Sequence, residues 1–225
     1  MVSMSLRLSI TPMQLCLAMI VSIVAHGHAP AAVTINTTPV GSPNNPGHSV
    51  DSRSVGSVAY LYSIATTEMT NNQYADFLNA KAATSNDPYS LYDSRMQSDT
   101  AGGITQTDLG SGNFSYHVKS GYENYPVNFV DVLDAARFAN WMHNGQGNGN
   151  TENGSYLFTD FSTFSRTANA TWVLPNEDEW HKAAFYDAAG TDYFDYAVTS
   201  NTAPGKSMPP GTDPAANYDL VNTDP

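Results

Sequence analysis

Paired acids are the first residues of this chain that could do chemistry. Asp131 and Asp134 lie three residues apart, and two carboxylates at such a spacing could share acid–base work. They also stand at the start of a predicted helix, where negative side chains favour the positive end of the helix dipole. We therefore interpret both as helix-start residues and not as a catalytic pair.

Histidines, serines and oxygen-rich loops give no stronger candidate. His117, His143 and His181 are too scattered to predict a set of metal ligands. The segment 148–154 alternates oxygen donors, but its glycine is misplaced for a helix-flanked calcium loop, and no acid follows at the twelfth loop position. The chain has no Gly-x-Ser-x-Gly elbow and no glycine-rich phosphate loop.

The first 31 residues predict a signal peptide. Arg7 gives a weakly positive start, and the run from Leu15 to Ala25 is apolar but too short to span a bilayer. Small residues before position 32 predict cleavage after Ala31. The chain's one cysteine, Cys16, would leave with the peptide, so the mature chain would have no thiol for a disulfide, a nucleophile or a metal site. We expect a secreted, periplasmic or cell-envelope protein without a membrane span.

The charge of the chain excludes some partners. Its net charge is −12, and loss of Arg7 leaves eight basic against twenty-one acidic side chains, hence −13. Such a surface repels phosphate backbones and anionic headgroups. We therefore expect no nucleic-acid partner and no peripheral attachment to an anionic membrane.

Capping signals predict the elements that hold these side chains. Thr70 and Gln73 form a Thr-x-x-Gln capping box at the start of a helix over 70–81. A second helix, over 131–144, has its apolar residues at i, i+3, i+4 and i+7 and ends at an Asn-Gly pair. A third, over 176–187, follows a short strand and a proline.

The third helix has the best-defined start. Asn176 can accept from the first-turn N–H groups, and Glu179 can reach back to it. Trp180 lies on one face with alanines at i+3 and i+4, so we expect its ring to be buried. Trp141 and Trp180 could instead line a ligand groove, but we interpret both as core residues.

The rest of the chain predicts an α+β domain. Residues 32–57 are rich in Pro, Gly, Asn and Ser and indicate a linker or an irregular arm, and the domain would occupy 58–225. Alternation predicts a strand over 58–64 and a short one over 113–118. Helices scattered among short strands and long loops argue against βαβ repetition.

Three blocks, in order, resemble the formylglycine-generating enzyme, or sulfatase-modifying factor, family. The blocks are Met69 to Phe77 (the family's V-T-n-x-x-Y-x-x-F), Pro126 to Trp141 (P-V-x-x-V-x-x-x-D-A-x-x-F-x-x-W) and Val173 to Trp180 (R-L-P-T-E-x-E-W). Val173 stands where the family usually has arginine, so a charge that could pair with a nearby acid is missing. Asn176 replaces the usual threonine and can still cap the helix.

This resemblance implies a fold and an activity. The fold would be the low-regularity C-type-lectin-like kind, and the activity would be copper-dependent oxidation of a sulfatase cysteine to formylglycine. The resemblance covers about residues 58 to 221, roughly the first two thirds of a family domain. Family members continue into a G-N-V-W-E-W segment and a region with paired redox cysteines. We expect the domain to be truncated at its C-terminus, without catalytic or copper-binding residues.

The resemblance also implies half of a calcium site. Asn217 and Tyr218 match the A-N-x of the family's first calcium site, where the Asn side chain and the next residue's carbonyl are ligands. Calcium prefers six to eight oxygen ligands. The sequence as given supplies only these two, and a plain surface turn is the favoured interpretation of these residues as they stand.

Two functions are therefore open. The first is an exported sulfatase-modifying-factor protein whose partner would be a sulfatase or another protein substrate. The second is a non-catalytic, lectin-like module whose long loops at 84–123 and 145–170 recognise a protein or a glycan at the cell envelope. Cysteines further along the natural gene would favour the first, and their absence would favour the second.

Overall fold

The computed structural model describes residues 32–84, 87, 89–160 and 162–203. Within these residues it has four helices, which are α1 (Asn71–Lys81), α2 (Arg95–Ser98), α3 (Val132–His143) and α4 (Glu177–Phe185). Ten short strands accompany them: β1 (Thr37–Val40), β2 (His48–Val50), β3 (Arg53–Val55), β4 (Tyr62–Ala65), β5 (Ile104–Gly110), β6 (Asn113–Val118), β7 (Tyr156–Phe158), β8 (Phe164–Arg166), β9 (Tyr186–Asp187) and β10 (Asp192–Tyr193).

All the described strands pair antiparallel in two-stranded ribbons. Four ribbons join consecutive strands, namely β2–β3, β5–β6, β7–β8 and β9–β10. The fifth pairs β1 with β4, in the register Thr37 opposite Ala65 and Val40 opposite Tyr62. Short strands mixed with helices confirm the predicted α+β class.

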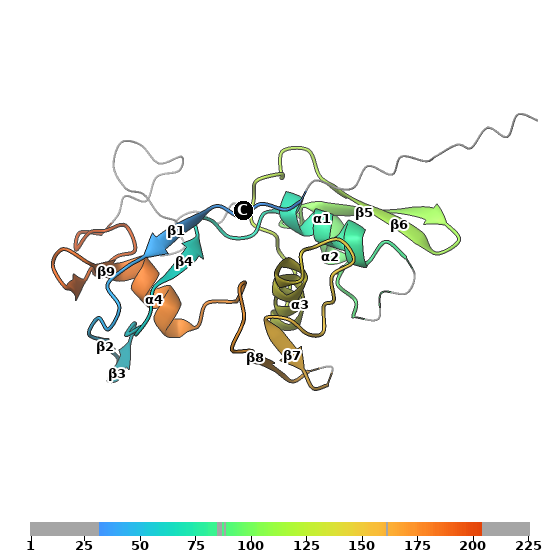
Figure 1. The fold of residues 1–225 in the computed structure, drawn as a ribbon. Coiled ribbons are helices and arrows are strands. Elements are labelled where there is room, and N and C mark those ends of the chain that lie inside the picture. The colour runs from blue at the N-terminus through green and yellow to red at the C-terminus, as the bar shows by residue number, and fades with distance from the viewer. Residues whose placement is uncertain (1–31, 85–86, 88, 161, 204–225) are drawn as a thin grey trace, which may run out of the picture.

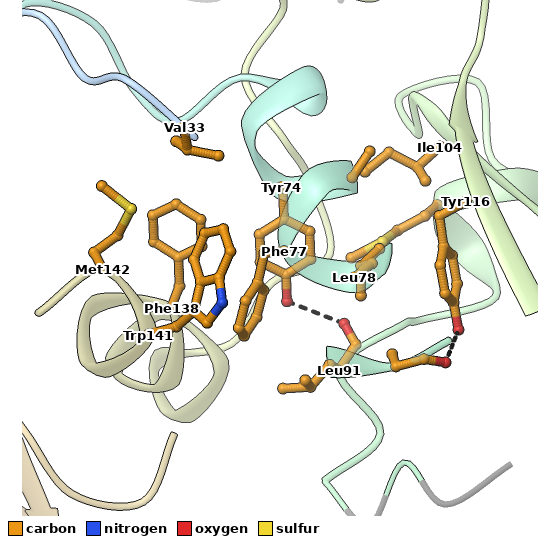
Figure 2. Packing of buried hydrophobic residues seen from close by; sticks show 13 residues of the cluster. Val33, Tyr74, Phe77, Leu78, Leu91, Ile104, Tyr116, Phe138, Trp141 and Met142 are labelled. Atoms are coloured by element: carbon orange, nitrogen blue, oxygen red, sulfur yellow. Dashed lines mark hydrogen bonds between the residues drawn. The ribbon is translucent and has the colours of Figure 1, made fainter. Parts of the chain in front are cut away.

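The elements gather in two groups (Figure 1). One contains α1, α2, α3 and the ribbons β5–β6 and β7–β8, and the other contains β1 to β4, α4 and β9. The main hydrophobic core lies in the first group. Figure 2 shows Tyr74 and Phe77 of α1 packed against Phe138 and Trp141 of α3. The ring centroids of Phe77 and Phe138 lie 5.3 Å apart and edge to face, an arrangement that aromatic pairs prefer.

Side-chain caps fix the three long helices where the sequence predicts them. Thr70 accepts from the Gln73 N–H, and the Gln73 side chain accepts from the Thr70 N–H, so the predicted capping box forms. Asn176 and Glu179 make the same pair of bonds at α4. Asp131 caps α3 by accepting from two first-turn N–H groups.

The prediction that residues 32–57 form a linker is wrong. This segment contains β1, β2 and β3, and β1 pairs with β4 along its whole length. Val33 is buried in the main core, and its N–H and C=O both bond the Gln146 side chain. Proline, glycine and asparagine in this segment serve turns between very short strands, a use that local composition does not distinguish from a linker.

The predicted burial of Trp180 is also wrong. Its side chain is 53% exposed, whereas Glu179 and Lys182 on the neighbouring face are 2% and 1% exposed. Trp141 is a core residue as expected. The predicted strand over 58–64 forms only as β4, from Tyr62, and the strand over 113–118 forms in full as β6. No helix in the described part of the chain is long and apolar enough to cross a membrane.

Candidate functional site

The described residues enclose a pocket of about 350 Å³ beside the start of α3. One wall comes from the loop before α2 and the other from the segment that leads into α3. The lining residues are Tyr89, Ser90, Asp93, Arg95, Phe129, Val130, Asp131 and Asp134. A volume of this size suits a small ligand.

Asp134 is the most perturbed acid in the pocket. The residue is 8% exposed, and burial raises the pKa of its carboxyl to about 7. The nearby Asp131 raises this pKa further, while Arg137, whose Nη1 lies 3.8 Å from the Asp134 carboxylate, opposes the shift. A carboxyl with such a pKa exchanges its proton near neutral pH, which is a property of functional sites.

Arg137 supports the pocket from beneath. Its guanidinium is almost fully buried and bonds Glu152 through Nε at 2.9 Å and Nη2 at 3.4 Å. The same group lies over the Tyr89 ring at 4.2 Å and over the Phe158 ring at 4.6 Å. Because a buried guanidinium is held by a carboxylate and two rings, the Tyr89 wall has a rigid backing.

Arg95 and Asp93 form a second charged pair at the pocket rim. Arg95 Nε donates to Asp93 Oδ1 at 3.0 Å, and Arg95 Nη2 donates to Asp93 Oδ2 at 2.6 Å. These hydrogen bonds lower the pKa of Asp93 to about 2, so it stays ionised. The Arg95 guanidinium also lies over the Phe129 ring at 4.9 Å, which fixes the position of that ring.

Two non-glycine residues that line the pocket have positive φ. Phe129 has φ 62° and Ser90 has φ 55°, both in the left-handed region. An aromatic residue in that region costs on the order of 1 kcal/mol, and such strain is concentrated at functional sites. Strained backbone on both walls is a second, independent reason to choose this pocket as the candidate site.

Of the described residues that the sequence analysis singled out, only Asp131 and Asp134 line this pocket. Asn217 and Tyr218, the proposed calcium ligands, lie outside the described residues. Asp131 caps α3 as expected, but Asp134 is a buried acid and not only a helix-start residue. A signal was available in the sequence, since Arg137 follows Asp134 by one helical turn and could share its face.

The histidines separate as predicted, with one exception. His117 bonds Ser115 and His143 bonds Thr171. His181, however, lies beside His48, a pairing that the sequence does not predict, with 2.9 Å between His181 Nε2 and His48 Nδ1. No group of three or more His, Cys, Asp or Glu side chains in the described ranges could hold a metal ion.

The replacement of arginine by Val173 has a structural compensation. Glu179, the buried acid of the third block, accepts from Arg166 Nη1 at 2.9 Å and from the Tyr60 hydroxyl at 2.6 Å. The cation therefore comes from β8, and Val173 instead packs in the smaller apolar cluster with Tyr156. Local electrostatics at this acid are kept although the expected arginine is absent.

Capped helices with short antiparallel ribbons define a mixed α+β domain of low regularity. Residues 29–218 match the family model described as the sulfatase-modifying factor enzyme 1-like domain. The chain therefore belongs to this family, whose fold is the C-type-lectin-like kind. The match includes the segment 32–57, in agreement with the strands found there. Neither the curated proteins nor the solved structures gave a match.

Proposed function

We propose that this domain is a carbohydrate-binding module of the sulfatase-modifying-factor family, with the pocket at Asp134 as its binding site. The observation that carries the proposal is the combination of two fixed aromatic rings with a near-neutral carboxyl in one small pocket. Tyr89 and Phe129 offer apolar faces to the C–H side of a sugar ring. Asp134, when protonated, can both donate to and accept from sugar hydroxyls.

The charges around the pocket favour a neutral ligand. Arg95 is already paired with Asp93, and Arg137 with Glu152, so neither guanidinium needs an anion from the ligand. An anionic ligand would be repelled by Asp93 and Asp131. A cationic ligand would have to compete with Arg95 and Arg137 for the carboxylates. Uncharged hydroxyl groups avoid both penalties, which supports a neutral sugar unit as the ligand.

A glycan array probed with the full chain tests this proposal. We expect binding to neutral glycans, and at least tenfold weaker binding by the Phe129→Ala variant, which loses one ring. Leu109→Ala is the matched control, because Leu109 is a large exposed side chain on the β5–β6 ribbon and lines no part of the pocket. Absence of binding to any neutral glycan, or equal binding by Phe129→Ala, would overturn the proposal.

Family membership favours a second candidate function, oxidation of a sulfatase cysteine to formylglycine. The family chemistry requires a cysteine pair that holds copper, and the one cysteine in the sequence, Cys16, does not supply it. The described residues thus do not fit a copper–thiolate centre, and we derive no step through copper. Reading the coding DNA past codon 225, together with copper-dependent turnover of a cysteine peptide, decides this candidate.

We also propose that the protein is exported and that it binds calcium. We expect cleavage after Ala31 and an extracytoplasmic location, which the mass of the mature protein tests. Calcium at Asn217 and Tyr218 should raise the melting temperature of the full chain, whereas magnesium should not, since Mg²⁺ demands a more rigid octahedral shell. Equal effects of the two cations would contradict a calcium site at these residues.

A further inference from the structure

A second hollow, of about 410 Å³, lies between α4 and the β1–β4 ribbon. Figure 1 shows α4 close to this ribbon in the group of elements away from the main core. Its lining residues are Thr38, Pro39, Val40, Gly41, Ser42, Ile64, Ala65, Thr66, Lys182, Ala183, Tyr186 and Ala188. We name it the α4 groove. It shares no lining residue with the pocket at Asp134.

Among the described residues that line the α4 groove, Lys182 is the one with a charged side chain. It is 1% exposed, and its Nζ donates to the Ser42 carbonyl at 2.9 Å. An ammonium carries three donors, so two remain without an acceptor among the described residues. The rings of Tyr62 and Tyr186 lie 5.9 and 6.0 Å from Nζ, at the outer limit of a cation–π contact.

No acid in the described part of the chain neutralises this ammonium. The nearest acid along α4, Glu179, lies one turn earlier and is engaged by Arg166, Tyr60 and the Asn176 N–H. None of the ion pairs in the described part of the chain involves Lys182, and burial lowers its pKa. A buried cation without a counter-ion is strongly unfavourable, so an anion that reaches it would gain a large interaction.

We propose that the α4 groove binds a small aliphatic carboxylate, with Lys182 as its counter-ion. Ile64, Val40 and Ala183 provide apolar contact for the aliphatic part of such a ligand. Thr38 and Ser42 also line the hollow, and a hydroxyl of either residue is a suitable donor for the second carboxylate oxygen. A carboxylate suits this site because one compact anionic group matches the point charge of a lysine.

Nuclear magnetic resonance of the full chain with isotope-labelled lysine tests the proposal. Butyrate is the probe, and butyramide is its neutral counterpart of similar size. We expect the chemical shift of the Lys182 side chain to change saturably with butyrate in the millimolar range. We also expect the pKa of Lys182 to rise when butyrate is bound. Butyramide should produce neither effect.

Two variants complete the test. Lys182→Met keeps the apolar stem and removes the charge, and we expect it to weaken butyrate binding about tenfold or more. Lys81→Met is the matched control, because Lys81 Nζ also donates to one carbonyl, that of Gly149 at 2.9 Å, and does not line the groove. We expect Lys81→Met to bind butyrate as the unmodified chain does.

Three results would overturn the proposal. Equal binding of butyrate and butyramide would show that the charge is not recognised. An unchanged pKa of Lys182 at saturating butyrate would place the probe elsewhere. A Lys182 pKa above that of free lysine before any addition would show that a carboxylate of the chain itself already occupies the site. The wild-type measurement remains decisive even if Lys182→Met fails to fold.

Discussion

Asp134 is the residue on which the binding proposal depends most. Folding raises the pKa of its carboxyl from an ordinary 3.8 to about 7, so the folded chain holds a proton that the unfolded chain has released. Its contribution to stability is therefore full below about pH 4 and is lost as pH rises to about 7. The penalty at higher pH is the unfavourable burial of a negative charge.

We predict that Asp134→Asn removes this penalty. At about pH 8 the variant should be more stable than the unmodified chain by about 1–2 kcal/mol, less than the full pKa shift implies because water screens the pocket. At about pH 4 the two proteins should differ little. Urea unfolding at both pH values measures the difference, and a variant that is equally or less stable at high pH would contradict the predicted protonation.

Arg137 gives a second prediction at the residue scale. Arg137→Met leaves Glu152 without its partner and removes the cation between Tyr89 and Phe158. We expect a loss of about 3 kcal/mol in the free energy of unfolding. Arg95→Met is the matched control, since the Arg95–Asp93 pair is largely exposed and its removal should cost clearly less stability than that of Arg137. Equal losses in the two variants would contradict the buried network.

At the element scale, the start of α4 holds two buried charges in place. The capping box at Asn176 orients the first turn, which carries Glu179 toward Arg166 and sets the direction of Lys182. We predict that Asn176→Ala costs about 1 kcal/mol, since the first-turn N–H groups lose their acceptor. Asn72→Ala, at an exposed position in the first turn of α1 that is not the cap, should cost under about 0.5 kcal/mol. Thermal unfolding of the two variants measures the difference. Similar losses of stability would contradict a stabilising role of the Asn176 cap.

How much of these elements the sequence predicts depends on the range of the interactions. Thr70, Asp131 and Asn176 mark helix starts correctly because their bonds reach only three residues along the chain. The prediction that Trp180 is buried fails because the face of α4 that is buried depends on contacts with residues far away in the sequence. Glu179 and Lys182 are buried by contacts to residues such as Ser42 and Tyr60.

The candidate site was hidden from sequence analysis for the same reason. Tyr89 and Phe129 belong to irregular segments, where neither helical nor strand periodicity operates. Both residues line the pocket, and each ring is held by an arginine: Arg137 lies 4.2 Å from the Tyr89 ring and Arg95 lies 4.9 Å from the Phe129 ring. Only the acids at the start of α3, Asp131 and Asp134, drew attention in advance, since their spacing is local.

At the scale of the whole molecule, a histidine pair fastens the N-terminal strands to α4. His48 of β2 stacks on Tyr193 at 4.7 Å, and its Nδ1 meets His181 Nε2 of α4. Gly56 permits this approach, because a Cβ there would lie 2.7 Å from the Tyr193 hydroxyl and 2.9 Å from the His181 ring. Burial and His48 lower the pKa of His181 from 6.5, while Glu177 and Asp178 oppose the shift.

This pair predicts acid sensitivity. Because folding lowers the pKa of His181, its contribution is full above pH 6.5 and declines as pH falls below that value. As the pH falls from about 7 to about 5 we expect the free energy of unfolding to decrease, and we expect His181→Gln to reduce that decrease. His143→Gln is the control, as His143 bonds only the exposed Thr171 region. An unchanged slope in His181→Gln would exclude the pair as its source.

The pH dependence of sugar binding tests the central claim most directly. Calorimetry would measure the affinity of the full chain for its best array glycan at about pH 5.5 and pH 8.5, beside Asp134→Asn. We predict that the unmodified chain binds several-fold more weakly at the higher pH, where Asp134 becomes a carboxylate, while the variant changes little. Affinity that is independent of pH in the unmodified chain, or the same decline in both proteins, would contradict a binding site at Asp134.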